Sequence, residues 1–148
     1  MDNSHYPSPS IYYALVCLQV MTSYLHNRKS LYPPFGALKD TVKVYLRGSV
    51  SPYMIIDSAK GLIDSVTFKA EMKFNFNLSP GNYYLDIRHR NSIETWSAVP
   101  VTYSFGSPVT YDFTLSPASA YGNNEKSAGS KWGIFSGDVD QNGFIDLS

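Results

Sequence analysis

The chain has 148 residues, of which twelve are Lys or Arg and twelve are Asp or Glu, so its formal net charge is zero. This balance, with only 16% charged residues, lacks the basic surplus of a nucleic-acid-binding protein, and we expect no nucleic-acid partner. Cys17 is the single cysteine, which excludes an internal disulfide and a zinc site built from cysteines. Aromatic residues make up 15% of the chain, and this composition favours a small, neutral domain of β-strands.

Residues 1–38 differ from the rest and form an unassigned N-terminal segment. The run from Ile11 to Leu25 is mostly apolar, but its fifteen residues fall short of the about 20 that a membrane-spanning helix needs, so we expect no membrane span. Its flanking charges are reversed for a signal peptide, because Asp2 precedes the run and cations follow it. A secretion signal, a loosely ordered or buried helix, and a segment not native to the domain remain open. We expect residues 1–38 to be dispensable for folding.

From Asp40 onward, apolar and polar residues alternate with the two-residue period of a β-strand. The longest alternating stretch runs from Val66 to Leu78, and shorter ones cover residues 42–47, 83–88 and 109–115. Each has one apolar face, as in antiparallel sheets that cover a core on one side. The pattern predicts a core that includes Phe68, Met72, Phe74, Phe76, Leu85, Ile87 and Phe113.

Turn residues separate these runs. Ser79-Pro80-Gly81-Asn82 supplies the fixed φ of proline and the free φ of glycine, as a hairpin turn requires. With the later breaks, about seven strands fit between Asp40 and Phe135, the number typical of a two-sheet sandwich. A polar loop at 118–131 precedes a last short strand at 132–135. We therefore predict an all-β fold, a two-sheet antiparallel β-sandwich over residues 39–136.

The segment 137–148 has the residue spacing of a calcium-binding loop. Oxygen ligands at alternate positions can converge on a hard cation, and a glycine at the sixth position permits the turn between them. The candidate ligands, at positions 1, 3, 5, 7 and 9 of such a loop, are Asp138, Asp140, Asn142, the carbonyl of Phe144, and Asp146. The bidentate carboxylate of position 12 would fall at residue 149, so we expect a truncated loop with a weak or incomplete calcium site. A solvated acidic turn is the alternative.

Several motifs resemble known families. The ending GDVDQNGFID resembles the first half of a type I dockerin repeat, and FNFNLSPGNYYLDI (74–87) resembles the strand, turn and strand signature of prealbumin-like and carboxypeptidase-regulatory-like sandwiches. RHRNSIETWSA (88–98), VTYDFT (109–114) and AYGNN (120–124) follow in the order of a β-sandwich module near the C-termini of large secreted bacterial proteins, including those of Bacteroidetes. The resemblance covers residues 41–148 and implies an Ig-like or prealbumin-like sandwich.

The same resemblance implies a function and a location. It indicates a non-catalytic accessory, spacer or attachment module of an extracellular or cell-surface bacterial multidomain protein, with calcium as its cofactor. The implied partners are neighbouring domains of the same polypeptide, with a cohesin-like protein or a polysaccharide as external partners. The alternative is a carbohydrate-binding module of a secreted polysaccharide-degrading enzyme.

A second candidate site combines Arg88, Arg90 and Trp96, because two cations beside an aromatic ring can hold a carboxylate or a sugar. Alternation turns His89 inward and both arginines outward, so the simpler interpretation is a hydrogen-bonded histidine closing a strand. Trp96 and Trp132 are core anchors or, alternatively, part of a carbohydrate platform. Four tyrosines would join such a platform if coplanar and exposed: Tyr45, Tyr84, Tyr103 and Tyr121.

Catalytic signatures are missing from the sequence. It contains no HExxH, GxSxG, SxxK, GxGxxG or Walker motif, and the three histidines are widely separated. The carboxylates that could form a glycosidase pair, Glu71, Glu94 and Asp112, are predicted to face solvent. We therefore expect that the protein is not an enzyme.

Overall fold

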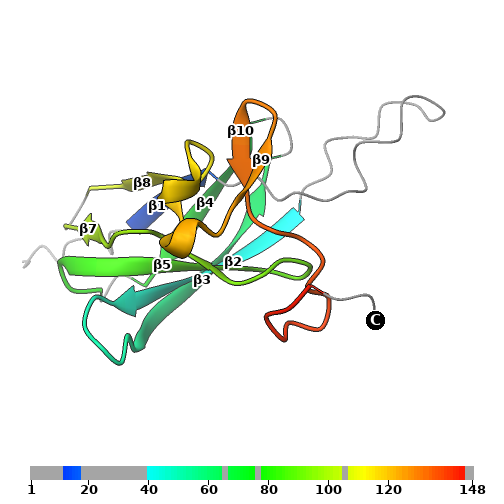
Figure 1. Cartoon of the computed structure of the whole chain (residues 1–148). Helices are drawn as coiled ribbons and strands as arrows, with labels where there is room; N and C mark the ends of the chain where they lie inside the picture. Colours follow the sequence, from blue (N-terminus) through cyan, green and yellow to red (C-terminus); the bar gives the residue numbers. More distant parts are fainter. Residues whose placement is uncertain (1–11, 18–39, 65–66, 76–77, 105–106, 146–148) are drawn as a thin grey trace, which may run out of the picture.

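The computed structural model of the chain describes residues 12–17, 40–64, 67–75, 78–104 and 107–145. Strands dominate this part of the chain, and its helical pieces are two 3-10 turns, so the all-β prediction is confirmed (Figure 1). The strands are β1 Tyr12–Cys17, β2 Asp40–Gly48, β3 Ile55–Ile63, β4 Lys69–Phe74, β5 Gly81–His89, β6 Thr95–Trp96, β7 Val101–Tyr103, β8 Val109–Asp112, β9 Lys126–Ala128 and β10 Lys131–Gly133, and the 3-10 turns are η1 Pro117–Ser119 and η2 Tyr121–Asn123.

The larger sheet has five strands in the order β3-β2-β5-β6, with β7 also paired to β5. All of its pairs are antiparallel. Alternation in β2 buries Val42, Val44 and Leu46, and it leaves Lys43 and Tyr45 on the opposite, outer face. Because β2 is paired residue by residue with both β3 and β5, its outward side chains belong to rows that cross the sheet.

The second sheet has the order β4-β1-β8, with β1 antiparallel to β4 and parallel to β8. The helix considered for the apolar N-terminal run is therefore wrong for Tyr12–Cys17, which form the central strand of this sheet. A continuous apolar run does not distinguish a helix from a buried strand, and the pairing partners that decide it lie far along the chain. Since β1 joins β4 to β8, this part of residues 1–38 belongs to the same fold as the strands that follow the boundary expected at residue 39.

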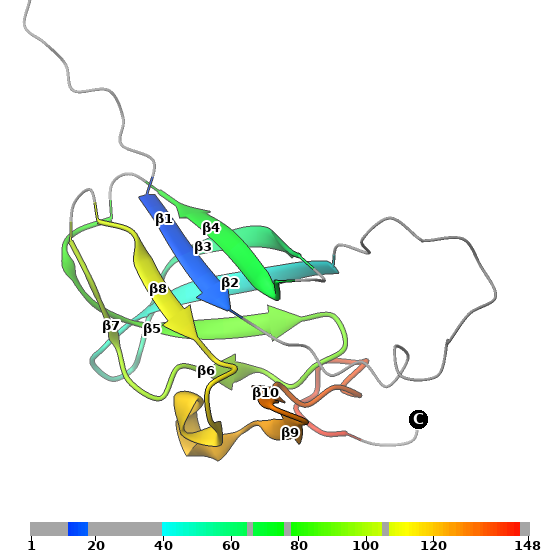
Figure 2. The same ribbon diagram turned by 90° about the horizontal axis from the view of Figure 1, so that it is seen from above.

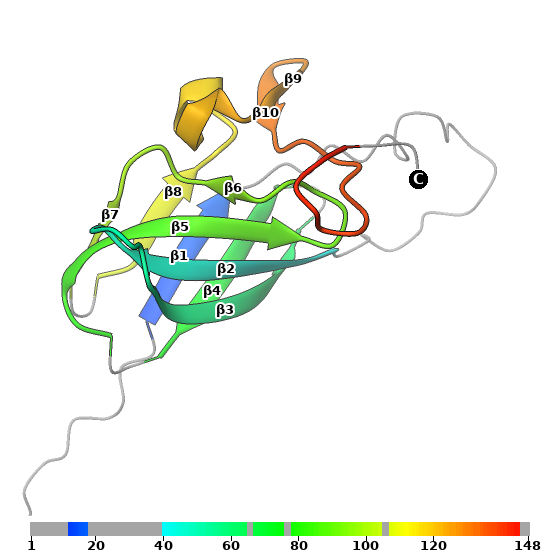
Figure 3. The same ribbon diagram turned by 60° about the horizontal axis from the view of Figure 1, so that its bottom comes forward.

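The two sheets share one core. Figures 2 and 3 show the β4-β1-β8 sheet lying over one face of β2 and β5, with its strands crossing theirs at an angle. Buried side chains from both sheets form a single hydrophobic cluster, in which Val44 and Ile87 join Met72 and Phe113. The prediction of core residues is confirmed for Met72, Phe74, Leu85, Ile87 and Phe113.

Phe68 and Leu115 lie on the apolar faces of the alternating runs 66–78 and 109–115, and the prediction that these faces point inward is wrong for both. Phe68 is 37% exposed and has a φ of 56°, because it lies in the turn in which its N–H bonds the carbonyl of Asp64, before β4 begins. Leu115 is 67% exposed, since β8 ends at Asp112, whose carboxylate caps the next turn by accepting the N–H of Thr114. In both cases a local turn ends the alternation before the sequence pattern does. Phe76 lies outside the described residues.

The chain after β8 returns to the end of β5. The loop expected at 118–131 contains η2 and the strand β9, which pairs with β10. Next, Ser136 bridges to Ser92, and the N–H of Gly137 donates to the carbonyl of Asn91 at 3.0 Å. These contacts fix the acidic C-terminal loop against the turn that follows β5.

Candidate functional site

The acidic loop is attached to the end of β5 by specific contacts. The Gln141 side-chain amide donates to the backbone carbonyl of His89 at 3.0 Å and to that of Asp138 at 3.1 Å. Gly137 has a φ of 120°, and a Cβ there would lie 2.9 Å from the Ile145 side chain, so a larger residue at 137 would displace the loop. The loop therefore has a defined position on the β5 end of the molecule.

The loop folds around Asp138, which is 2% exposed. One carboxylate oxygen of Asp138 accepts the N–H of Asn142 and the other accepts the N–H of Gly143, both at 3.0 Å. The Asn142 amide donates to Asp140 at 2.9 Å, and its carbonyl oxygen accepts the N–H of Phe144 at 2.8 Å. Gly143, with a φ of 86°, makes the sharp turn that the motif requires. Three of the predicted ligands, Asp138, Asp140 and Asn142, are thus brought together.

The remaining predicted ligands are less defined. Phe144 follows directly in the loop with its side chain exposed, and Asp146 lies outside the described residues. Within the described residues, no three side chains of His, Cys, Asp or Glu gather around a common metal position. The described carboxylates of the loop are Asp138 and Asp140, and further oxygens would have to come from Asn142, backbone and solvent.

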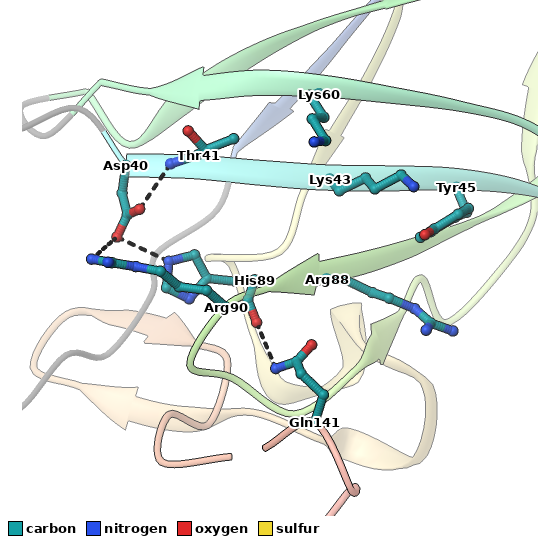
Figure 4. A pocket seen from close by; sticks show the side chains of 9 residues that line it. All are labelled: Asp40, Thr41, Lys43, Tyr45, Lys60, Arg88, His89, Arg90 and Gln141. Carbon is teal, nitrogen blue, oxygen red and sulfur yellow. Dashed lines mark hydrogen bonds and ion pairs between the residues drawn. The ribbon is translucent and has the colours of Figure 1, made fainter. Parts of the chain in front are cut away.

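A second feature lies beside this loop, on the outer face of β2, β3 and β5. It is a hollow of about 590 Å³ whose lining includes Lys43, Lys60, Arg88, Arg90, Tyr45 and Gln141. Figure 4 shows how the side chains of these three strands and of Gln141 surround it. We call this feature the basic hollow. Its cations come from three strands, β2, β3 and β5, and from the turn that follows β5.

The strand register places three cations of the basic hollow in one row. Lys43 of β2 is directly opposite Lys60 of β3 on one side and Arg88 of β5 on the other. The Lys43 ammonium lies 4.2 Å from the centre of the Tyr45 ring, and the Arg88 guanidinium carbon lies 5.1 Å from the same centre. Arg88 also pairs with Glu94 at 2.6 Å, so its charge is partly neutralised.

Asp40 and His89 close one end of the basic hollow. His89 is buried, as alternation predicted, with Nε2 2.9 Å from a carboxylate oxygen of Asp40 and Nδ1 3.2 Å from the Ser92 hydroxyl. Although burial opposes it, hydrogen bonds from His89 and Thr41 lower the pKa of the Asp40 carboxyl. Arg90 lies 3.6 Å from the same carboxylate, with 80% of its side chain exposed. Asp40, the acidic residue in the lining of the hollow, is therefore already paired with His89 and Arg90.

Trp96 lies apart from the basic hollow. The Arg47 guanidinium carbon is 4.7 Å from the centre of its ring, and the Trp96 N–H donates to Glu94 at 2.6 Å. Of the three residues proposed from sequence, Arg88 and Arg90 are thus brought together in one hollow, and Trp96 is not. Arg47 also pairs with the fully buried carboxylate of Asp86 at 2.8 Å, and burial is the main cause that raises the pKa of Asp86.

The aromatic residues of this face do not form a flat platform. Tyr53 meets Trp96 at an interplanar angle of 89° and Tyr84 at 83°, while Tyr84 and Trp96 are inclined at 48°. Tyr103 is buried in the core, and Tyr121 lies in η2. Tyr53, Tyr84 and Trp96 are therefore not coplanar, and they do not form a flat surface on which a sugar could stack. Trp132 of β10 is half-buried.

The expected solvent-facing carboxylates differ among themselves. Glu71 is exposed, whereas Glu94 is half-exposed and paired with Arg88. Asp112 is half-buried and accepts the hydroxyl and N–H of Thr114. Glu125 is only 5% exposed, and neither of its carboxylate oxygens has a hydrogen-bond partner in the described part of the chain. Burial first, and then the charge of Asp112, raises the pKa of Glu125 to about 8.

Comparison of this chain with protein-family models, with curated proteins and with solved structures finds no match. Its function must therefore be argued from its own residues. Among the residues that the structure describes, no helix has the length and apolar character needed to cross a membrane.

Lys43 and Lys60 are the site residues that sequence reasoning missed. Alternation turns Lys43 outward, but Lys60 lies in a strand with the weakly patterned sequence IIDSAKGLI. Their juxtaposition depends on the register between β2 and β3, which no local pattern contains.

Proposed function

We propose that this chain is a non-catalytic accessory or attachment module of an extracellular bacterial multidomain protein, with an Ig-like or prealbumin-like sandwich and a dockerin-like calcium loop. The observation that carries the proposal is the folding of the loop around Asp138, with Asp140 and Asn142 alongside. The position of this loop against the turn after β5 adds support, because a docked loop loses less conformational entropy when it binds an ion. The work of such a module is to space, present or attach neighbouring domains.

Calcium would be held by oxygen atoms of the loop. The ligands would be Asp138, Asp140, Asn142, the Phe144 carbonyl and Asp146, with water completing the usual six to eight oxygens. A carboxylate oxygen that accepts one N–H retains a second lone pair for a cation, so the hydrogen bonds of Asp138 are compatible with this role. For this set of five ligands, which includes no bidentate carboxylate, we expect a dissociation constant of about 10⁻⁴ to 10⁻³ M or weaker.

Calorimetric titration of the chain with calcium tests this proposal. We compare it with a version extended by an acidic residue at position 149 and a helix, which should bind at least about tenfold more tightly because of the added charge and rigidity. Asp140→Asn in the extended version should weaken binding, whereas Glu71→Gln on β4 removes an equal charge and should not. If the extended version gives no calcium heat, the calcium proposal is wrong.

A carbohydrate-binding module is the second candidate, and the basic hollow is the observation that favours it. Its lining combines cations with the hydroxyls of Thr41 and Tyr45 and the side-chain carbonyl of Gln141, groups that can bind sugar hydroxyls. Retention of the chain on polysaccharide columns would favour this candidate over a spacer.

A further inference from the structure

The row of cations in the basic hollow is unfavourable for the sheet by itself. Like charges directly opposite each other on paired strands destabilise a sheet, and here Lys60, Lys43 and Arg88 occupy consecutive paired positions. Adjacent strands are about 4.8 Å apart, so the charges of this row act on one another at short range. An anion bound over the row would relieve this repulsion.

The chain itself supplies little neutralising charge for this row. Arg88 has Glu94 and Asp86 as partners, and Asp40 is occupied by His89 and Arg90. Within the part of the chain that the structure describes, neither Lys43 nor Lys60 has a carboxylate partner. The contact of Lys43 with the Tyr45 ring leaves its formal charge in place. Two lysines on the outer face of the sheet are therefore available to an external anion.

We propose that the basic hollow binds an acidic glycan, with Lys43, Lys60 and Arg88 contacting carboxylate or sulfate groups of its sugars. The inference deepens the carbohydrate-binding alternative and rests on it. Hydroxyl groups of Thr41 and Tyr45 line the same hollow and can bind the sugar hydroxyls between the charged groups (Figure 4).

A nucleic acid fits this hollow less well. The chain has zero net charge, and the cations that line the hollow, Lys43, Lys60, Arg88 and Arg90, are few for contacts along a phosphate backbone. The Tyr45 ring already contacts Lys43 and Arg88, which occupies surface that a base would need for stacking. A short row of cations beside hydroxyl groups matches charged sugars better than a polyphosphate.

The test measures binding of the whole chain to five immobilised probes at low salt. They are polygalacturonate, its methyl-esterified neutral form, chondroitin sulfate, double-stranded DNA and polyglutamate. We expect binding to one or both acidic glycans, weakened by added salt, and no comparable binding to the other three probes. A preference for polygalacturonate would assign the anion as carboxylate, and a preference for chondroitin sulfate, which carries carboxylates as well, would indicate that sulfate adds to binding.

The decisive variant is Lys43→Gln/Lys60→Gln, with Lys126→Gln/Lys131→Gln as its control. The control removes the same charge from the exposed lysines of β9 and β10, outside the hollow. We expect the first variant to lose at least about tenfold in affinity and the control to change less than about twofold. The first variant should also melt at the same temperature as the parent or higher, because it removes like charges placed opposite each other.

Each other outcome overturns the inference. Equal affinity of the two variants would mean that the hollow is not the binding site. Equal binding of the methyl-esterified glycan would keep the carbohydrate function but remove the anion from it. Equal binding of DNA or polyglutamate would reduce the hollow to a non-specific cation patch. Binding to none of the probes would reject the acidic glycan, while the calcium proposal would still be judged by calorimetry.

Discussion

At the scale of single residues, Glu125 is a buried carboxylate in an unfavourable environment. A buried carboxylate without a hydrogen-bond partner is costly when charged, and the nearby Asp112 adds repulsion, so the folded state favours the protonated form. The ordinary pKa of 4.5 applies to the unfolded chain, and the folded value is about 8. Because the folded pKa is the higher one, the contribution of Glu125 to stability is greatest below about pH 4.5, falls between these values and is constant above about pH 8.

Glu125→Gln tests this assignment. The amide cannot ionise and has nearly the shape of the protonated acid, so it avoids the cost of a buried charge. We expect the variant to match the parent in melting temperature near about pH 4.5 and to exceed it near about pH 8. Melting curves across this range provide the measurement, with the exposed Glu71→Gln as the control. A constant difference at all pH values would show that Glu125 does not titrate between them.

At the scale of elements, β1 holds the three-stranded sheet together. Among the described strands, β1 alone joins β4 to β8 in the three-stranded sheet, because it pairs with both and they do not pair with each other. Loss of β1 would leave the backbone groups of two strands without their partners and uncover that side of the core. We therefore expect deletion of residues 1–38 to destabilise the fold, in place of the dispensability that the sequence pattern suggested.

Ala14→Pro tests the role of β1 without shortening the chain. Proline removes an N–H and is not tolerated within a central strand, so we expect an aggregated chain or a melting temperature lowered by at least about 10 °C. Ala14→Ser keeps the N–H and serves as the control. A proline variant that melts like the parent would contradict the central position of β1.

At the scale of the whole molecule, one core joins the two larger sheets, and a pair of phenylalanines tests its extent. Phe113 is fully buried in that core, whereas Phe68 is partly exposed in a turn. We expect Phe113→Ala to lower the free energy of unfolding by about 3 to 5 kcal/mol, through lost burial and a cavity. Phe68→Ala should lower it by less than about 1 kcal/mol. Urea denaturation compares the two, and similar losses would disprove this assignment of the core.

The sequence alone determined the features that depend on neighbouring residues. Two-residue periodicity identified the strands around Val44, Met72 and Leu85 and most of their buried side chains, because successive side chains in a strand alternate between faces. The spacing of the acidic loop identified Asp138, Asp140 and Asn142, which the structure brings together because they are close in sequence. The pattern failed at Phe68, where a turn replaced the strand.

Only the tertiary structure decided the features that depend on pairing between distant segments. The place of β1 between β4 and β8 could not be read from an apolar run, since both a helix and a buried strand satisfy it. The row of Lys60, Lys43 and Arg88 exists because two strand registers align residues that are 17 and 45 positions from Lys43. The burial of Glu125 likewise depends on how the segment after β8 packs against the rest. The local sequence pattern determines which face of a strand a side chain occupies, whereas long-range packing determines which residues it contacts.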